Sequence, residues 1–419
     1  MKVMTRRLLV LGAGTAGTMI ANRMRRVLDA RDWEITIVDK DDVHLYQPGF
    51  LFLPFATYRP DQVRRSRHTL LADGIDLVLA GVEQIDAGAG TVTLGDGRVL
   101  AYDQLVITTG TSPRPDQTPG MLGDLWRRDV FDFYTFDGAM ALQRALQQLT
   151  GGRLVVHVTD MPIKCPVAPL EFVFLADAWL RARGMRERTE LVFATPLSGA
   201  FTQPVAAERL GSLLADRDIR VETDYLVERI DEQGKALVSY DERRIDFDLL
   251  VTVPLNMGAE VITRSGLGDE LGYVPVDRHT LRSRAYENVF VVGDAADLPT
   301  SKAGSVAHFA VETFVHNFPL LVEGREPVDA FDGHANCFVE TGNGKGLLID
   351  FDYDTQPLPG TYPLPWVGPM RLLTETRANH LGKLAFRWLY WNALLPGRPI
   401  PLPAHMSMRG KDTSLLAAA

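Results

Sequence analysis

Two cysteines are the side chains of this sequence best suited to redox chemistry. Cys165 and Cys337 are its only cysteines, and two are too few for a structural disulfide framework in a chain of 419 residues. Either one alone is more often an inert core residue, since free cysteine is among the most buried residue types. Cys165, however, follows Lys164 and precedes an apolar segment of helical spacing that starts near Pro169. A neighbouring ammonium and a helix N-terminus both favour the nucleophilic thiolate, so we expect Cys165 to be reactive.

The turn that carries Cys165 stands where a dinucleotide-binding loop is expected. Strand formers at Leu154–Val158 lead into Thr159–Pro166, and a helix at Leu170–Arg183 and a strand at Glu190–Ala194 follow. This is a βαβ unit, but its turn has no glycine. Its second strand is followed by neither an acid for an NAD ribose nor an arginine for an NADP phosphate. We infer that this unit holds a reactive sulfur in place of a nicotinamide cofactor.

An earlier glycine-rich turn does fit a dinucleotide. Gly12, Gly14 and Gly17 lie between a short apolar strand at Leu8–Leu11 and a helix at Thr18–Leu28. Glycines permit the tight turn and the close approach of phosphate, and the helix N-terminus supplies amide donors. The next strand ends at Asp39, at the spacing of the carboxylate that binds the ribose hydroxyls. We predict a dinucleotide site built from these residues, with Lys40 and Pro48 of the following loop beside it.

Two later segments indicate which dinucleotide is bound. Tyr102–Gly110 and Asn288–Ala296 are predicted strands that close in small-residue turns. They resemble the paired segments of flavoproteins with two dinucleotide-binding domains, where the first segment returns the chain to the flavin domain. The resemblance implies FAD, with Asp294 bonding its ribityl or pyrophosphate part. It also implies further cofactor contacts from Thr109, Gly110 and Gly293.

Composition limits the class of protein. Hydrophobic residues make up 46%, charged residues 23%, and the net charge is −9, as in a soluble globular protein of two or three domains. Without basic clusters, the chain has no electrostatic footprint for nucleic acid. The apolar run after Arg7 is soon broken by glycines, so it predicts a buried strand and not an export signal. No run of about 18 apolar residues occurs, so we expect no segment that spans a membrane.

We therefore predict an α/β fold with two Rossmann-like dinucleotide-binding domains and a C-terminal membrane-associating segment. The predicted boundaries are 1–130 and 275–328 for the FAD domain, 131–274 for the second domain, and 329–419 for the C-terminal region. In that region Leu381–Leu395 mixes apolar, aromatic and basic residues, including Lys383 and Trp388. This mixture suits a helix lying in the interfacial plane of a bilayer. An ordinary core or dimer helix explains it equally well.

Several segments together resemble the sulfide:quinone oxidoreductases, and the resemblance covers the whole chain. Its most specific parts are Lys164–Phe172, Phe331–Cys337, Phe351–Tyr353 and Leu389–Asn392. They look most like the group that includes the mitochondrial enzyme, which works with two redox cysteines. The region 125–135 lacks the third cysteine of other members. The loop Leu45–Phe50 lacks the cysteine that tethers flavin in flavocytochrome c, so we expect non-covalent FAD.

The resemblance implies a mechanism and its partners. Hydrosulfide attacks a bridge between Cys165 and Cys337 and leaves a persulfide on Cys337, while two electrons pass through FAD to a quinone. A thiol, sulfite or growing polysulfide then removes the sulfane sulfur. Lys302 stands at the family position for a lysine near the flavin, and Glu171 either shuttles protons or favours the helix dipole. We predict no metal.

The resemblance also implies a peripheral membrane protein, which we expect at the cytoplasmic face of a bacterial inner membrane. A homo-oligomer is left open. One alternative is a flavoenzyme like the NADH:quinone oxidoreductases, which the missing glycines of Thr159–Pro166 disfavour. The other is a persulfide carrier or redox sensor without turnover, using the same two cysteines as a switch.

Overall fold

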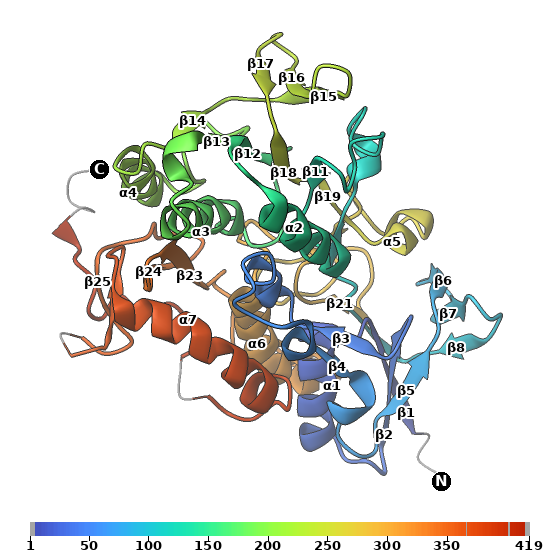
Figure 1. Cartoon of the computed structure of the whole chain (residues 1–419). Coiled ribbons are helices and arrows are strands. Elements are labelled where there is room, and N and C mark those ends of the chain that lie inside the picture. The colour runs from blue at the N-terminus through green and yellow to red at the C-terminus, as the bar shows by residue number, and fades with distance from the viewer. Residues whose placement is uncertain (1–4, 366, 401–402, 415–419) are drawn as a thin grey trace.

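Two parallel sheets organise the computed structural model, which describes residues 5–365, 367–400 and 403–414 (Figure 1). The first sheet has the strand order β21-β9-β1-β2-β5, with every neighbouring pair parallel. Its strands are Arg6–Leu11 (β1), Trp33–Asp39 (β2), Asp76–Leu79 (β5), Gln104–Ile107 (β9) and Val289–Val291 (β21). Leu8 to Leu11 are at most 2% exposed, as expected for a parallel sheet covered on both faces.

Helices α1 (Thr15–Val27) and α6 (Gly304–Val322) pack against each other beside this sheet. α1 starts at Thr15 and not at the expected Thr18, because Gly14 already serves as its N-cap. The glycine turn therefore leads directly into the first helical turn.

The second sheet has the strand order β11-β18-β12-β13-β14 and is also parallel throughout. Its strands are Val130–Phe131 (β11), Gly152–Val158 (β12), Thr189–Ala194 (β13), Arg220–Glu222 (β14) and Leu249–Val253 (β18). Its helices are Phe136–Gln148 (α2), Ala168–Ala182 (α3) and Pro204–Ala215 (α4). The βαβ unit around Cys165 is thus present as predicted, with α3 close to the expected limits. The α/β class predicted from the sequence is confirmed.

Short antiparallel elements complete these two units. They are β3 (Val43–Leu45) with β4 (Arg64–Ser66), β6 (Val82–Asp86) with β7 (Thr91–Leu94) and β8 (Val99–Ala101), β10 (Thr111–Pro113) with β19 (Asn256–Gly258), and β15 (Val227–Asp231) with β16 (Ala236–Ser239) and β17 (Arg244–Asp246). Helix α5 spans Glu260–Arg264, and β20 (Val274–Pro275) pairs with β22 (Ala296–Asp297).

The C-terminal region adds a four-stranded sheet and a helix. The sheet order is β23-β24-β26-β25, with β23 at Ala335–Gly342, β24 at Lys345–Phe351, β25 at Gly360–Tyr362 and β26 at Met370–Leu372. Helix α3 of the second unit packs across β23, and α7 (Arg377–Leu389) packs on β23 and β24. The C-terminal region therefore folds back onto the Cys165 unit (Figure 1).

The predicted helix at Leu381–Leu395 is divided in two. α7 ends at Leu389 and a π-helical turn, Tyr390–Leu394, follows. Tyr390, Trp391, Leu394 and Leu395 are at most 5% exposed, so this second half is a core segment. Among the residues that the structure describes, no helix has the length and apolar character needed to cross a bilayer.

Candidate active site

Cys165 lies on the turn between β12 and α3, and two backbone contacts fix it. Its φ is 47°, in the left-handed region that few non-glycine residues adopt. Its amide donates to the carbonyl of Lys302 at 2.6 Å, and Tyr134 donates its hydroxyl to the Cys165 carbonyl at 3.2 Å. The turn of the second sheet is therefore attached to the segment that leads into α6.

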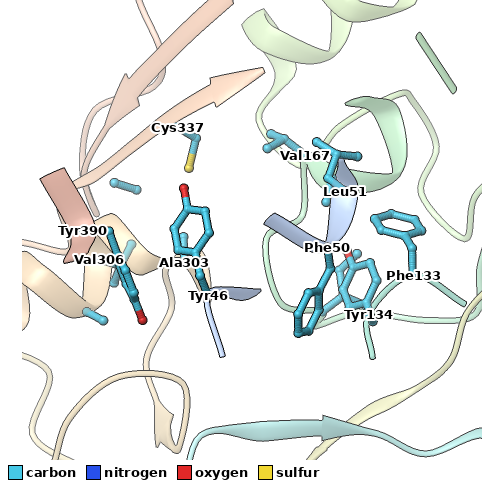
Figure 2. Packing of buried hydrophobic residues seen from close by; sticks show 14 of the residues in the cluster. Tyr46, Phe50, Leu51, Phe133, Tyr134, Val167, Ala303, Val306, Cys337 and Tyr390 are labelled. Carbon is cyan, nitrogen blue, oxygen red and sulfur yellow. The ribbon is translucent and has the colours of Figure 1, made fainter. Parts of the chain in front are cut away.

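Cys337 lies on β23, with its side chain directed into the same interior. It is 8% exposed, and both cysteines are free thiols within one hydrophobic cluster. Figure 2 shows its sulfur and the hydroxyl of Tyr46 directed toward each other. Because α3 packs across β23, the fold brings together two cysteines that are far apart in the sequence. The charge of Cys337 is among those that act on Cys165.

A buried ion pair stands between these two elements. Glu171, on the first turn of α3, is 1% exposed, and Lys383 of α7 donates to its Oε1 at 2.5 Å. The same carboxylate oxygen accepts the amide of Glu340 on β23 at 2.7 Å, and Lys383 also donates to the carbonyl of Phe338 at 3.1 Å. α3, β23 and α7 thus meet at one carboxylate and one ammonium.

This arrangement corrects the expected charge environment of Cys165. The Nζ of Lys164 donates to Gln47 Oε1 at 3.0 Å, and the ammonium that acts on Cys165 belongs to Lys383. Burial, and after it the Glu171 carboxylate, raise the pKa of the Cys165 thiol, while Lys383 acts in the opposite direction. The prediction that Lys164 and the helix N-terminus hold Cys165 as a thiolate was wrong, because Lys164 is not among the charges that act on the thiol and burial outweighs the amide at the helix N-terminus.

Burial also shifts the pKa values of the other titratable groups of the site. Burial raises the pKa of Cys337 to about 12, against the lowering effects of Lys383 and of a hydrogen bond with Ser305. Burial also raises the pKa of Glu171, and Lys383 offsets this only in part. For Lys383 burial lowers the pKa, but the charges of Glu171 and Cys165 prevail and hold that pKa above its ordinary value.

A second buried carboxylate lies near this ion pair and bonds to a partly exposed histidine. Glu340 is 1% exposed, and its carboxylate lies 2.9 Å from Nδ1 of His380, whose side chain is 24% exposed. Burial raises the pKa of Glu340, and Lys383 and His380 oppose it. The sequence did not predict Lys383, Glu340 or His380 as site residues. The predicted interfacial role of Lys383 is corrected, since this side chain is 12% exposed and points inward.

The glycine turn of the first sheet has the shape that a dinucleotide requires. Gly12 has a φ of 99°, and a Cβ there would lie 2.6 Å from the Thr108 carbonyl oxygen. A Cβ on Gly17 would lie 1.9 Å from the carbonyl oxygen of Gly12. A Cβ on Gly14 would meet no atom of another segment within 4 Å, which leaves space at the N-terminus of α1. The residues present therefore fit FAD, with this turn at its pyrophosphate.

The other predicted cofactor residues surround this turn or its neighbours. Asp39 accepts the amide of Ala13 at 2.7 Å and pairs with Arg67 at 3.0 Å. Burial raises the pKa of Asp39, with Arg67 opposing it. Lys40 is exposed, and Pro48 lies in a 3-10 turn, Gln47–Leu51.

Two later turns approach α1 from the neighbouring strands. Thr109 has a buried hydroxyl without a hydrogen-bond partner in the described structure, and a polar atom of the cofactor would satisfy it. Gly110 and Gly293 have φ values of 69° and 82°, and a Cβ on Gly293 would lie 3.2 Å from that of Ala16. Burial raises the pKa of Asp294, and Lys302 and Lys164 oppose it.

Lys302 points into the protein. Its Nζ donates to the carbonyls of Asp294 at 2.9 Å and Ala296 at 3.1 Å, and it lies 3.8 Å from the centroid of the Tyr273 ring. Burial lowers its pKa, and Asp294 opposes this. Its expected role near the flavin stays a prediction.

Comparisons with known proteins agree with this geometry. A family model for pyridine nucleotide-disulphide oxidoreductases matches residues 6–157, and so ends just before the Cys165 turn. Mitochondrial sulfide:quinone oxidoreductase from Mus musculus is 26% identical over 93% of this chain and 86% of its own length. The crystal structure of sulfide:quinone oxidoreductase from Aquifex aeolicus superimposes with a TM-score of 0.79 at 21% identity, over 94% of this chain and 92% of that one. Type II NADH:quinone oxidoreductase from Staphylococcus aureus is 21% identical over 82% of this chain and 90% of its own length.

Over more than nine-tenths of its length the chain is thus similar to sulfide:quinone oxidoreductases. It is an FAD-dependent oxidoreductase, and the glycine turn of the first sheet, with Asp39 and Thr109, is where its residues fit that cofactor. The second sheet keeps the nucleotide-binding topology but carries Cys165 at its turn. Within the described residues no cluster of three or more potential ligands is placed to hold a metal.

Proposed function

We propose that this protein oxidises sulfide to protein-bound sulfane sulfur with Cys165 and Cys337, and passes the electrons through FAD to a membrane quinone. One observation carries the proposal. The turn that replaces the nicotinamide loop carries Cys165, and α3 behind it packs on the strand of Cys337, with the Glu171–Lys383 ion pair between them.

The proposed cycle starts from a disulfide between the two cysteines. Hydrosulfide attacks Cys337, so that an S–S bond forms to Cys337 while the bond to Cys165 breaks and leaves a thiolate there. A thiol or sulfite then takes the sulfane sulfur, and Cys337 is released as a second thiolate. Re-forming the disulfide releases two electrons. FAD held at the glycine turn of the first sheet would supply the two-electron oxidant for this step, with quinone as the final acceptor.

The charged side chains have proposed tasks in this cycle. Lys383 attracts the hydrosulfide anion and stabilises whichever cysteine leaves as thiolate, since it lowers the pKa of both thiols. Glu171, with a raised pKa, takes up the proton of the entering sulfide. Glu340 bonds to Glu171 only through its backbone amide, so Glu340 and the partly exposed His380 act as a separate carboxylate–imidazole pair at the edge of the site.

Attachment to a membrane completes the proposal. α7 exposes Leu381 and Trp388, which are 63% and 67% exposed, on the side away from its packed face. These residues suit the interfacial level of a bilayer, from which a quinone enters. The cytoplasmic face of a bacterial inner membrane stays a prediction.

Anaerobic sulfide titration of the purified flavoprotein tests this function. We expect sulfide to bleach the flavin absorption of the wild type, and added quinone to restore it. Cys165→Ala and Cys337→Ala should each slow bleaching by roughly a thousandfold. Wild-type rates in both variants contradict the mechanism. Bleaching without reoxidation by quinone indicates a persulfide carrier or sensor.

A further inference from the structure

The outer face of α7 is apolar and uncovered. Leu381, Ala385 and Trp388 follow one another at spacings of four and three residues and are all exposed. The loop between β25 and β26 also exposes Leu364 and Val367, by 59% and 80%. We call Leu381, Ala385 and Trp388 the α7 outer face.

Arginines border this face at both of its ends. Arg377 is exposed one helical turn before Leu381. At the other end the guanidinium of Arg65 lies 4.6 Å from the ring centroid of Trp391, which follows Trp388 by one turn. Arg64 precedes it on β4 and is also exposed. Figure 1 shows the end of α7 close to these N-terminal segments.

The positive charge at this border is not neutralised by ion pairs, although Arg64 and the Asp61 carboxylate act on each other from beyond ion-pair distance. The sequence has no aspartate or glutamate from Arg377 to Lys411, although the whole chain carries a net charge of −9. In the described ranges, no carboxylate lies within ion-pair distance of Arg64, Arg65 or Arg377. By contrast, Arg59 and Arg67 of the same loop are paired with aspartates. Unpaired arginines beside an exposed tryptophan are suited to phosphate groups at an apolar surface.

We propose that the α7 outer face binds a lipid surface with anionic headgroups. Trp388 and Leu381 lie at headgroup level, and Arg64, Arg65 and Arg377 contact the lipid phosphates. This inference rests on the proposed membrane attachment and adds the class of headgroup. A second copy of the chain is a poor occupant, because a twofold contact would place the same unpaired arginines opposite one another.

Vesicle flotation with the full-length, FAD-loaded protein tests the inference. We expect binding to phosphatidylcholine vesicles that contain phosphatidylglycerol, loss of this binding at high salt, and weak binding to phosphatidylcholine alone. Arg64→Gln with Arg65→Gln should weaken anionic binding by roughly 25-fold, or about fivefold for each arginine. Arg188→Gln with Arg209→Gln is the matched control, since both arginines are exposed on the second unit. This control should bind like the wild type.

Equal binding to both kinds of vesicle, unchanged in the Arg64/Arg65 variant, overturns the inference in favour of a purely apolar contact. Self-association that Trp388→Ser abolishes overturns it in favour of a second copy. Sulfide-dependent bleaching in detergent with a short-chain quinone is measured in parallel. If the proposed chemistry is wrong, this bleaching is absent from wild type and variants alike, whatever the vesicles show. If only the lipid inference is wrong, bleaching is intact in all of them.

Discussion

At the scale of single residues, the pKa of Cys165 is set by burial and by two opposite charges, one on the helix that follows the cysteine and one on the distant α7. Burial raises this pKa most, Glu171 raises it further, and Lys383 lowers it. Whenever the proposed disulfide is reduced, the Cys165 thiol is therefore protonated at neutral pH. This suits a site in which reactivity depends on the entry of a sulfur anion more than on a permanently ionised cysteine.

Two substitutions should change the reactivity of Cys165 in opposite directions. Glu171→Gln removes a negative charge, so the pKa of Cys165 falls and alkylation by iodoacetamide at a fixed alkaline pH becomes faster. Lys383→Met removes the opposing ammonium, so that pKa rises and alkylation becomes slower. Each unit of pKa changes the thiolate fraction roughly tenfold. Mass mapping of alkylated Cys165 over a pH series measures both shifts.

Lys164→Met is the control for this pair. Lys164 is next to Cys165 in the chain, but its ammonium is bonded to Gln47. The pH profile of Cys165 should therefore stay where it is in the wild type. A larger shift from Lys164→Met than from Lys383→Met contradicts the assignment of Lys383 as the ammonium that acts on the thiol.

At the scale of elements, two glycines of the cofactor turn have different roles. Gly17 is required for the packing of α1, and we expect Gly14 to be required for the approach of FAD. Gly17→Ala places a Cβ 1.9 Å from the Gly12 carbonyl oxygen, so α1 has to move and both stability and FAD affinity should fall. Gly14→Ala meets no protein atom within 4 Å. We expect it to keep the wild-type denaturation temperature without FAD but to weaken FAD binding by about tenfold or more, because phosphate approaches there.

Fluorescence titration of the deflavinated protein with FAD measures this difference. Gly211→Ala, in α4, is the control, since its Cβ also meets no atom within 4 Å. Unchanged FAD affinity in Gly14→Ala would falsify the placement of the pyrophosphate at this turn.

The C-terminal tail is held by a second buried ion pair. Lys411 and Asp350 pair at 2.5 Å with side chains 1% exposed, and Asp350 also accepts from Asn336, next to Cys337. Lys411→Met removes one of two charged partners of a buried carboxylate, which then keeps only His334, and should destabilise the fold by about 3 kcal/mol. Urea unfolding measures this loss. Arg409→Met, an exposed neighbour, should have no effect, and Lys411→Met with Asp350→Asn should recover most of the stability.

At the scale of the whole molecule, the second sheet is attached to the FAD unit through the turn where a nicotinamide would bind. The Cys165 amide bonds to the Lys302 carbonyl, and Lys164 and Lys302 form a parallel bridge. We therefore expect NADH to bleach the flavin at least roughly 100-fold more slowly than sulfide. Stopped-flow mixing with each reductant measures the two rates. Rapid bleaching by NADH alone identifies an NADH:quinone oxidoreductase instead.

The sequence by itself determined the two Rossmann-like units and the cofactor turn. These features depend on local patterns: apolar strands, glycines at Gly12 and Gly17 where backbone atoms nearly touch, and an acid at Asp39. The turn of Cys165 and its lack of glycine are local features of the same kind. Each of these patterns involves residues that lie close together in the sequence, so it can be recognised without a structure.

Only the tertiary structure decided which charge faces Cys165. Lys164 is adjacent in sequence, yet the effective ammonium comes from Lys383, which α7 delivers to Glu171. The same segment also consists of a helix with an apolar outer face and a buried π-helical turn. Its amino-acid composition did not predict this division. Electrostatics and burial depend on distances across the fold, and these are fixed by how α3, β23 and α7 pack, not by their order in the chain.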